Sequence, residues 1–186
     1  MRVIAGTARS LPLKTPSGPE TRPTTDRIKE TLFNILQAEV PQSVCMDLFS
    51  GSGGIGIEAL SRGAAFCYFV EHQNKAFACM EENVRFTGFA DRAAMLRQDV
   101  LSALMTIREQ EVDLIFMDPP YQGGYEEKVL EILASREYVT ERTLIIAEAE
   151  IKKDFTFAED LGFRICKEKL YKTNKHVFLE RKGSRE

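Results

Sequence analysis

The sequence lacks the features that define membrane and secreted proteins. None of its apolar runs approaches the roughly 20 residues that a membrane-spanning helix needs. Its opening residues, MRVIAGTARS, do not contain the apolar core of a secretory signal. We therefore expect a cytoplasmic protein with no membrane partner.

Residues that commonly bind metals are also scarce. The chain has four cysteines, Cys45, Cys67, Cys79 and Cys166. None of them forms the Cys-x-x-Cys spacing that is typical of zinc sites. We interpret them as buried free thiols in a reducing compartment, and we predict no metal. His72 is predicted to lie in a loop and His176 on a strand surface, where neither would pair with a nucleophile.

The net charge of −3 argues only weakly against a nucleic-acid partner, because it hides an asymmetry. Residues 1–30 carry a net charge of +3, residues 31–163 carry −11 and residues 164–186 carry +5. Contacts with phosphates depend on local charge, so the basic ends would suit a phosphate backbone if they shared one face. Solvated termini would produce the same pattern.

The order of apolar and polar segments predicts an α/β fold in one domain. Helix-like stretches separate the apolar runs SVCMDLF, FCYFV, AAMLRQ, VDLIFM and TLIIAEA. This alternation predicts a doubly wound, Rossmann-like sheet that is mostly parallel. The segment TTDRIKETLFNIL predicts a helix that Thr24 or Thr25 caps. The segment FRICKEKLYKTNKHVFLERK predicts an antiparallel C-terminal hairpin.

A glycine-rich stretch, DLFSGSGGIGIEAL at residues 47–60, joins the first predicted strand to a helix. Glycines there allow a sharp turn and the close approach of a ligand, although a tight turn alone would have the same composition. Glu71 ends the next strand, twenty residues after Gly51. Doubly wound nucleotide-binding folds place an acid at that position to bind ribose. Asp99 follows the third strand, so these features should meet at one edge of the sheet.

The stretch LIFMDPPYQGG, residues 114–124, ends an apolar strand abruptly. Pro119 and Pro120 have no backbone N–H, so the strand must stop at Asp118. The stiff segment holds Asp118 and Tyr121 in a nearly fixed relation. Oxygen acceptors beside an aromatic ring suit a planar polar group that can be stacked on the ring.

Together the glycine loop, Glu71, Asp99 and the Asp-Pro-Pro-Tyr motif resemble class I S-adenosylmethionine-dependent methyltransferases that act on amino groups. Three further stretches are similar to the bacterial enzymes of the RsmD family: RVIAG near the start, TRPTTDRIKETLFNIL at residues 21–36 and GIEALSRGA at residues 56–64. That family modifies guanine N2 in 16S ribosomal RNA. The resemblance implies a basic extension at residues 1–22 and a methyltransferase domain at residues 23–186.

The resemblance also implies a role for each site residue. S-adenosylmethionine would be held by Asp47, Phe49, Ser50, Gly51, Ser52, Gly53, Glu71 and Asp99. The target amino group would donate to Asp118 Oδ and the Pro119 carbonyl, while Tyr121 stacks on the base. The RNA, within the small ribosomal subunit or its assembly intermediate, would contact Arg9, Lys14, Arg22 and Arg27. From the residues alone, Asp47 could equally cap a helix and Asp99 could be an ordinary loop acid.

Four other functions remain compatible with parts of the sequence. A DNA adenine or cytosine amino methyltransferase would share the Asp-Pro-Pro-Tyr chemistry, but 186 residues leave no room for a large target-recognition domain. A protein glutamine methyltransferase is chemically compatible, although the basic ends argue against it. A nicotinamide oxidoreductase would explain the glycine loop and Glu71 but not Asp-Pro-Pro-Tyr. An inactive RNA-binding module would not need both Asp118 and Tyr121.

Overall fold

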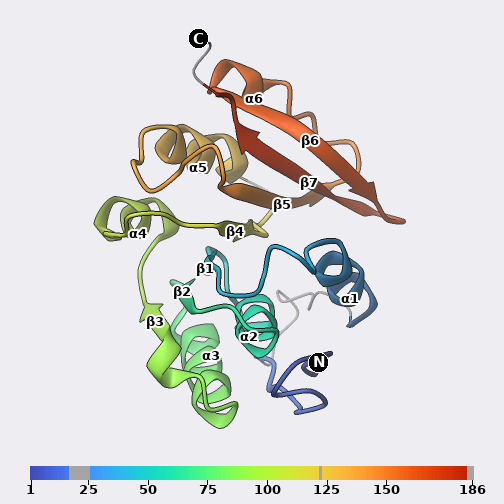
Figure 1. The fold of residues 1–186 in the computed structure, drawn as a ribbon, viewed down its shortest axis with the longest axis vertical. Helices are drawn as coiled ribbons and strands as arrows, with labels where there is room; N and C mark the ends of the chain where they lie inside the picture. The colour runs from blue at the N-terminus through green and yellow to red at the C-terminus, as the bar shows by residue number, and fades with distance from the viewer. Residues whose placement is uncertain (17–25, 122, 184–186) are drawn as a thin grey trace.

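The computed structural model describes residues 1–16, 26–121 and 123–183, which form one seven-stranded sheet with helices on both faces (Figure 1). The strands are β1 (Val44–Asp47), β2 (Phe66–Val70), β3 (Ala93–Leu96), β4 (Leu114–Met117), β5 (Leu144–Glu150), β6 (Phe163–Leu170) and β7 (Asn174–Arg181). Their order across the sheet is β3-β2-β1-β4-β5-β7-β6. The first five strands are parallel, and β7 pairs antiparallel with both β5 and β6. The predicted fold class is confirmed.

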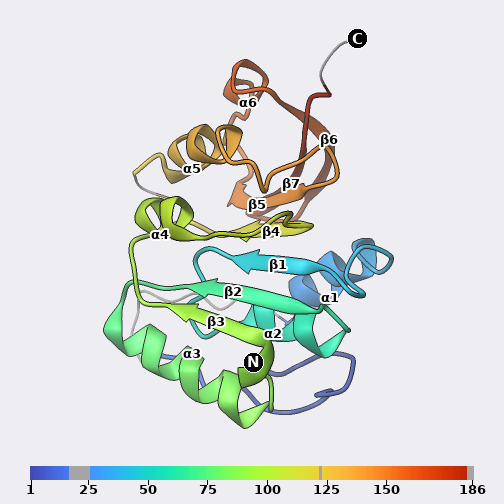
Figure 2. The same ribbon diagram turned by 60° about the vertical axis from the view of Figure 1, so that its left-hand side comes forward.

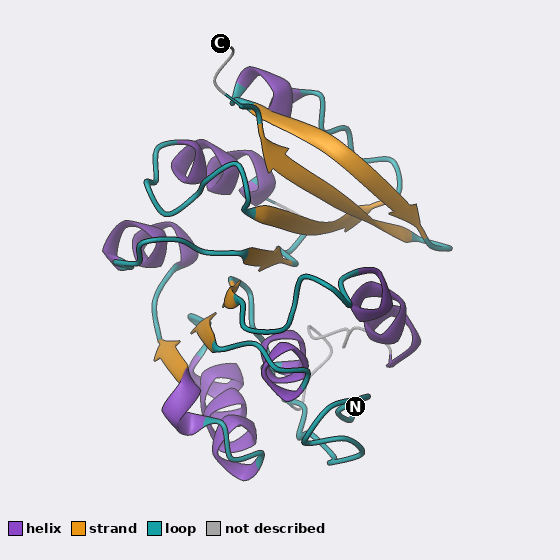
Figure 3. Ribbon diagram, in the orientation of Figure 1, coloured by secondary structure: helices purple, strands orange, loops and turns teal. Residues whose placement is uncertain are grey.

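Three helices cover each face of the sheet (Figure 2, Figure 3). One face carries α1 (Asp26–Ile35), α2 (Gly54–Ser61) and α3 (Asn74–Phe86). The other carries α4 (Val100–Thr106), α5 (Tyr125–Ala134) and α6 (Phe157–Asp160). A short 3-10 helix, η1 (Ala90–Arg92), precedes β3. Thr24 and Thr25, the predicted caps of α1, lie outside the described residues.

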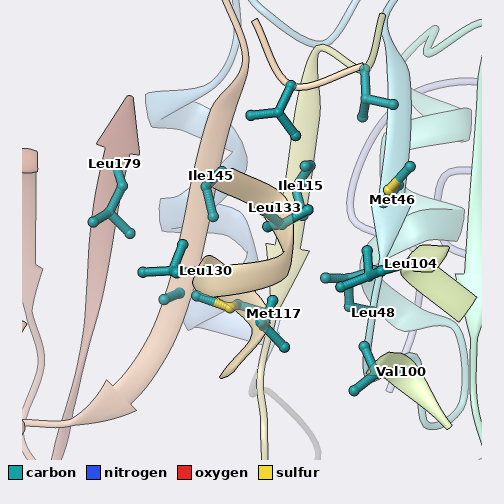
Figure 4. Packing of buried hydrophobic residues seen from close by; sticks show 14 of the residues in the cluster. Met46, Leu48, Val100, Leu104, Ile115, Met117, Leu130, Leu133, Ile145 and Leu179 are labelled. Carbon is teal, nitrogen blue, oxygen red and sulfur yellow. The ribbon is translucent and has the colours of Figure 1, made fainter. Parts of the chain in front are cut away.

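Apolar side chains from alternate strand positions fill the two layers between sheet and helices. Figure 4 shows the layer under α4 and α5, where Leu104 and Leu130 pack toward Met46, Ile115 and other strand residues. On the other face, apolar residues of α1 and α2 pack on Phe69, Phe116 and Phe178. Because every parallel strand is covered twice, these strands have nearly continuous apolar sequences.

The predicted hairpin forms, but its second strand is not at the edge of the sheet. β7 lies between β5 and β6, so both of its sides are paired. Six of its eight residues are therefore buried. β6 is the edge strand and is mostly exposed, and it contains the exposed Cys166. The prediction of buried thiols is confirmed for Cys45 and Cys67 only, since Cys79 is half-buried.

The N-terminal segment packs against α1 and α2 through one buried carboxylate. Glu58 of α2 accepts hydrogen bonds from the backbone N–H groups of Ile4 and Ala5, at 2.8 and 3.0 Å. Lys29 of α1, also buried, lies 3.5 Å from Glu58 and donates to the carbonyl of Arg2. Burial lowers the pKa of Lys29, and the nearby Glu58 opposes that shift. Residues 1–13 thus share a core with α1 and α2.

Candidate active site

A cavity of about 700 Å³ lies at the carboxyl ends of the central strands. One side, which we call the glycine-loop side, is lined by Asp47, residues 49–52 and Glu71. The other, which we call the β4–β7 side, is lined by residues 116–121, Glu148, Asn174 and His176. Ile28, Lys29 and Leu32 of α1 also line it. The cavity therefore gathers most of the predicted site residues.

The glycine loop is held in place by contacts that few other residues would allow. Gly53 precedes α2 with φ at 80°, a left-handed conformation that favours glycine. A Cβ on Gly56 would lie 2.3 Å from the Phe69 ring, so α2 approaches β2 only because Gly56 has no side chain. Ser50 ties the loop to β2, since its Oγ accepts from the N–H of Val70 at 3.0 Å.

Asp47 ends β1 and faces both the cavity and α2. Its Oδ2 accepts a hydrogen bond from the N–H of Gly56 at 2.9 Å, so the alternative role of helix cap is also fulfilled. Burial raises the pKa of Asp47 to about 7, with a further contribution from the negative charge of Glu71. Burial thus makes this negative charge costly, and a cationic ligand would offset that cost.

Glu71 is fixed beside the loop by two backbone donors. Its Oε2 accepts from the N–H of Gly51 at 3.0 Å and its Oε1 from the N–H of Gln73 at 2.7 Å. A carboxylate offers about four acceptor positions, so two remain for a ligand that carries hydroxyl donors. His72 lies beside it in the loop, as predicted, with Nδ1 3.5 Å from Glu71 Oε1.

Asp99 lies in a neighbouring pocket of about 40 Å³ that Phe49, Glu71 and Pro120 also line. Its Oδ1 caps α4 by accepting from the N–H of Leu101 at 2.9 Å and of Ser102 at 3.4 Å. Because both bonds use the same oxygen, Oδ2 remains for a ligand. Phe49 stands between the two cavities and packs edge-on against Tyr125, with ring centroids 5.6 Å apart.

The strand end at Asp118 has the geometry that the prolines predict. β4 stops at Met117, Pro119 is buried, and Tyr121 is 47% exposed at the side of the cavity. Asp118 lines the cavity and is exposed there. Desolvation by the cavity walls raises the pKa of Asp118 well above its usual value, and the charges of Glu148 and Asp47 raise it further.

The prediction for His176 is wrong, because this residue is buried and lines the cavity. β7 lies inside the sheet, and the Tyr171 ring packs edge-on against His176 with ring centroids 5.1 Å apart, so this residue is covered instead of lying on an open strand surface. The His176 Nδ1 lies 3.0 Å from the Tyr171 hydroxyl, and its Nε2 lies 3.3 Å from Glu148 Oε2. Asn174 donates to the other oxygen of Glu148. Sequence reasoning missed Glu148 and its two donors.

Strand register brings these side chains to one edge of the sheet. Asp47 pairs with Phe69 and Phe116, which face α1 and α2. Glu71 and Asp118 follow these two residues by two positions, just beyond the ends of β2 and β4, and line the same cavity as Asp47. Beside Asp118, three residues of β5, β7 and β6 are in register, which are Glu148, His176 and Lys169. Acidic residues thus dominate the centre of the site.

The four predicted RNA-binding residues do not form one cluster. Arg27 is exposed on α1, one residue before the cavity-lining Ile28. Lys14 forms an ion pair with Glu82 of α3. Arg9 follows Ala8, whose N–H donates to Ser61 Oγ at the end of α2 remote from the glycine loop, so Arg9 is placed there instead of at the mouth of the cavity. Arg22 lies outside the described residues.

The parts of the chain that the structure describes hold no helix long and apolar enough to cross a membrane. Within the same residues there is no group of three or more histidine, cysteine, aspartate or glutamate side chains arranged to hold a metal ion.

The doubly wound sheet with an inserted antiparallel β7 is that of the Rossmann-like methyltransferases. The solved structure of Escherichia coli yhhF, provisionally named a methyltransferase, superimposes with a TM-score of 0.84 at 28% identity over 99% of each chain.

Sequence comparisons identify the family. The model described as conserved hypothetical protein 95 matches residues 1–180. Ribosomal RNA small subunit methyltransferase D of Escherichia coli is 34% identical over 152 residues, which are 82% of this chain and 76% of that protein. The protein of the same name from Haemophilus influenzae is 33% identical over 171 residues, 91% of this chain and 88% of its own. The chain belongs to the family of ribosomal RNA small subunit methyltransferase D.

Proposed function

We propose that the protein transfers a methyl group from S-adenosylmethionine to the exocyclic N2 amino group of a guanine in 16S ribosomal RNA. One observation carries the proposal: the Asp118–Pro119 acceptors open onto the same cavity as the glycine loop and Glu71. The names of the relatives support ribosomal RNA as the substrate. Such a substrate would place the protein in the cytoplasm.

The chemistry of the glycine-loop side suits S-adenosylmethionine, which carries two positive charges, a ribose and an adenine. Asp47 and the backbone of residues 49–53 would hold the methionine portion, next to the negative charge that burial makes costly. Glu71 has two unused acceptor positions for the ribose hydroxyls. The small pocket beside Asp99 would take the edge of the adenine. When bound, the cofactor supplies an electrophilic methyl group on its sulfonium.

The β4 strand end suits the nucleophile of this reaction. An exocyclic amino nitrogen is a poor nucleophile because its lone pair is delocalised into the ring. If its two N–H groups donate to Asp118 Oδ and the Pro119 carbonyl, a pyramidal nitrogen is favoured and the lone pair is freed. These hydrogen bonds strengthen as positive charge develops on the nitrogen, so they stabilise the transition state most. The amino proton leaves after methyl transfer.

Tyr121 would support the base from its face. The residue is 47% exposed and lines the cavity, so a base in the cavity could lie against its ring. A base inside an RNA helix cannot reach this position, so the target nucleotide must be unstacked first. Stacking on an aromatic side chain contributes roughly 1–3 kcal/mol per base. Arg27, and more weakly Lys14, would contact nearby phosphates.

The decisive test is transfer of labelled methyl from S-adenosylmethionine to ribosomal RNA, presented as naked RNA and as small subunits. The RNA is then digested, and the product nucleoside is identified by mass spectrometry. We expect N2-methylguanosine at one nucleotide, with assembled or assembling subunits preferred over a short hairpin. Label in DNA, in a protein glutamine or in no acceptor would contradict the proposal, and so would tighter binding of NADH than of S-adenosylmethionine.

A further inference from the structure

We propose that Glu148 selects guanine over other bases by accepting the guanine N1–H beside the amino group held at Asp118. The inference rests on the proposed function and deepens it, because it assigns base recognition to a residue outside the Asp-Pro-Pro-Tyr motif. Two properties of Glu148 support the inference: it lies beside Asp118, and protein donors occupy about half of its acceptor positions. The hydrogen-bonding pattern of the bases provides the third argument.

The position of Glu148 follows from the register of two parallel strands. Met117 of β4 is paired with Ala147 of β5, so Asp118, the first residue after β4, lies beside Glu148, which is still within β5. Both line the cavity, and the charge of Glu148 is one of the causes that raise the pKa of Asp118. A planar base whose amino group reaches Asp118 therefore presents the adjoining ring position to Glu148.

The orientation of Glu148 is fixed by β7. Asn174 donates to its Oε1, and His176 Nε2 lies 3.3 Å from its Oε2. The Tyr171 hydroxyl is 3.0 Å from His176 Nδ1. When the hydroxyl donates to Nδ1, the Nε2–H of His176 donates to Glu148. This assignment satisfies every group in the chain from Tyr171 to Glu148.

Protein donors leave Glu148 with room for a ligand. A carboxylate has about four acceptor positions, and Asn174 and His176 occupy two of them. The remaining positions can only accept hydrogen bonds. A ligand group next to Glu148 must therefore be a donor, and a lone pair placed there would be repelled.

Only one of the common amino groups of nucleic acids has a donor beside it. The N2 amino group of guanine adjoins N1–H, which is a donor. The amino groups of adenine and cytosine adjoin N1 and N3, whose lone pairs are acceptors. A glutamine side-chain amide likewise adjoins a carbonyl oxygen. Glu148 thus favours guanine and disfavours each of the alternative substrates that Asp-Pro-Pro-Tyr chemistry alone would permit.

The test compares guanine with 2-aminopurine, which keeps the amino group at C2 but has a lone pair at N1. The target nucleotide is first mapped with the wild-type protein. Small-subunit RNA carrying either base there is then made by splinted ligation and assembled into subunits. Single-turnover methylation is measured for the wild type, Glu148→Gln and a matched control, Glu150→Gln, which removes the same charge from an exposed position of the same strand.

We expect the wild type and Glu150→Gln to methylate guanine at least roughly 100-fold faster than 2-aminopurine. In Glu148→Gln, guanine methylation should fall roughly 10- to 100-fold, and the preference for guanine should shrink by a similar factor, because an amide can donate to N1. Unchanged S-adenosylmethionine binding would show that the variant is folded.

Two outcomes would overturn the inference. If Glu148→Gln keeps the wild-type preference for guanine while the wild type produces N2-methylguanosine, Glu148 does not select the base and the proposed function stands. If the wild type methylates no guanine in any RNA, the proposed function fails, and the role of Glu148 fails with it.

Discussion

The two sides of the cavity are built in different ways. The glycine-loop side comes mainly from one stretch of chain, residues 47–73, and its geometry depends on backbone N–H groups and two glycines. On the β4–β7 side, Asp118, Glu148 and His176 come from three strands that are about 30 residues apart in sequence. Pairing between β4, β5 and β7 brings them together.

This difference suits two different tasks, namely binding a cofactor and recognising a particular substrate. A backbone-built loop can hold the same cofactor for many substrates, because it depends little on the identity of side chains. The β4–β7 side offers side chains whose hydrogen-bonding capacity is partly satisfied by the protein itself. Changes on one side should therefore affect cofactor binding, and changes on the other should affect methyl transfer to the base.

The largest expected effect concerns the buried carboxyl group of Asp47 on the glycine-loop side. The pKa of Asp47 is about 7 in the folded protein, whereas its ordinary value is 3.8. At a pH between these two values Asp47 is protonated in the folded protein and ionised in the unfolded chain. The contribution of Asp47 to stability is therefore fully present below about pH 4 and is lost as pH rises to about 7, by about 4 kcal/mol at most. Asp47→Asn should remove this part of the decline.

Urea unfolding of the wild type and of Asp47→Asn from about pH 4 to about pH 7 measures how the free energy of unfolding changes with pH. Asp118, whose pKa is also raised, contributes a decline of the same sign in both proteins. Parallel curves for wild type and Asp47→Asn would show that Asp47 is not the group responsible.

The next effect lies on the β4–β7 side. Asp118→Ala removes one acceptor for the target amino group, a loss that in comparable sites lowers the rate by roughly 100- to 1000-fold. Single-turnover methylation should fall by this amount, while calorimetry should find nearly unchanged affinity for S-adenosylmethionine. Activity within a few-fold of the wild type would mean that Asp118 does not hold the nucleophile.

The reciprocal change is on the glycine-loop side. Glu71→Ala should weaken S-adenosylmethionine binding by roughly 1.5–3 kcal/mol, the contribution of hydrogen bonds to a charged group. Glu71→Gln keeps one acceptor oxygen, so its affinity for S-adenosylmethionine should lie between those of the wild type and Glu71→Ala. At saturating cofactor the methylation rate should recover in both variants. If the rate at saturating cofactor stays low, Glu71 affects methyl transfer as well as cofactor binding, and the two sides of the cavity are not independent.

The smallest effect should come from the rim. Arg27→Glu should lower RNA affinity a few-fold. The slope of log affinity against log salt concentration should also become shallower by about 0.7–0.9, the value for one phosphate contact. Arg108→Glu reverses a charge of the same kind at an exposed position that follows α4, on the other face of the sheet. Equal losses in the two variants would indicate general electrostatic repulsion instead of a contact at Arg27.

The contrast between the two sides also explains what the sequence could reveal. The five parallel strands, α1 to α3 and the glycine loop have strong local signals, namely apolar runs, helical spacing and clustered glycines. Asp118 was identifiable because two prolines follow it. Glu148 has only a weak signal, an acid within the apolar strand TLIIAEA, which resembles Asp47 within VCMDLF.

His176 could not be placed from its neighbours in the chain. A hairpin pattern predicts two paired strands, but it does not reveal which of them will also pair with the rest of the sheet. Here the second strand does so, which places His176 beside Glu148 of β5 and under the Tyr171 ring. Positions that depend on register between distant strands are decided by the whole sheet, so local reasoning failed for this residue.

The insertion of β7 between β5 and β6 has a consequence for protein synthesis. The residues from Asp47 to Asp99 leave the ribosome well before His176, which follows Asp99 by 77 residues. At 5–20 residues per second, that interval is roughly 4–15 s. During this time a nascent chain can form its glycine loop, but it has neither of the donors that orient Glu148. If Glu148 selects the base as proposed, this selection becomes possible only when the last strand of the sheet has been added.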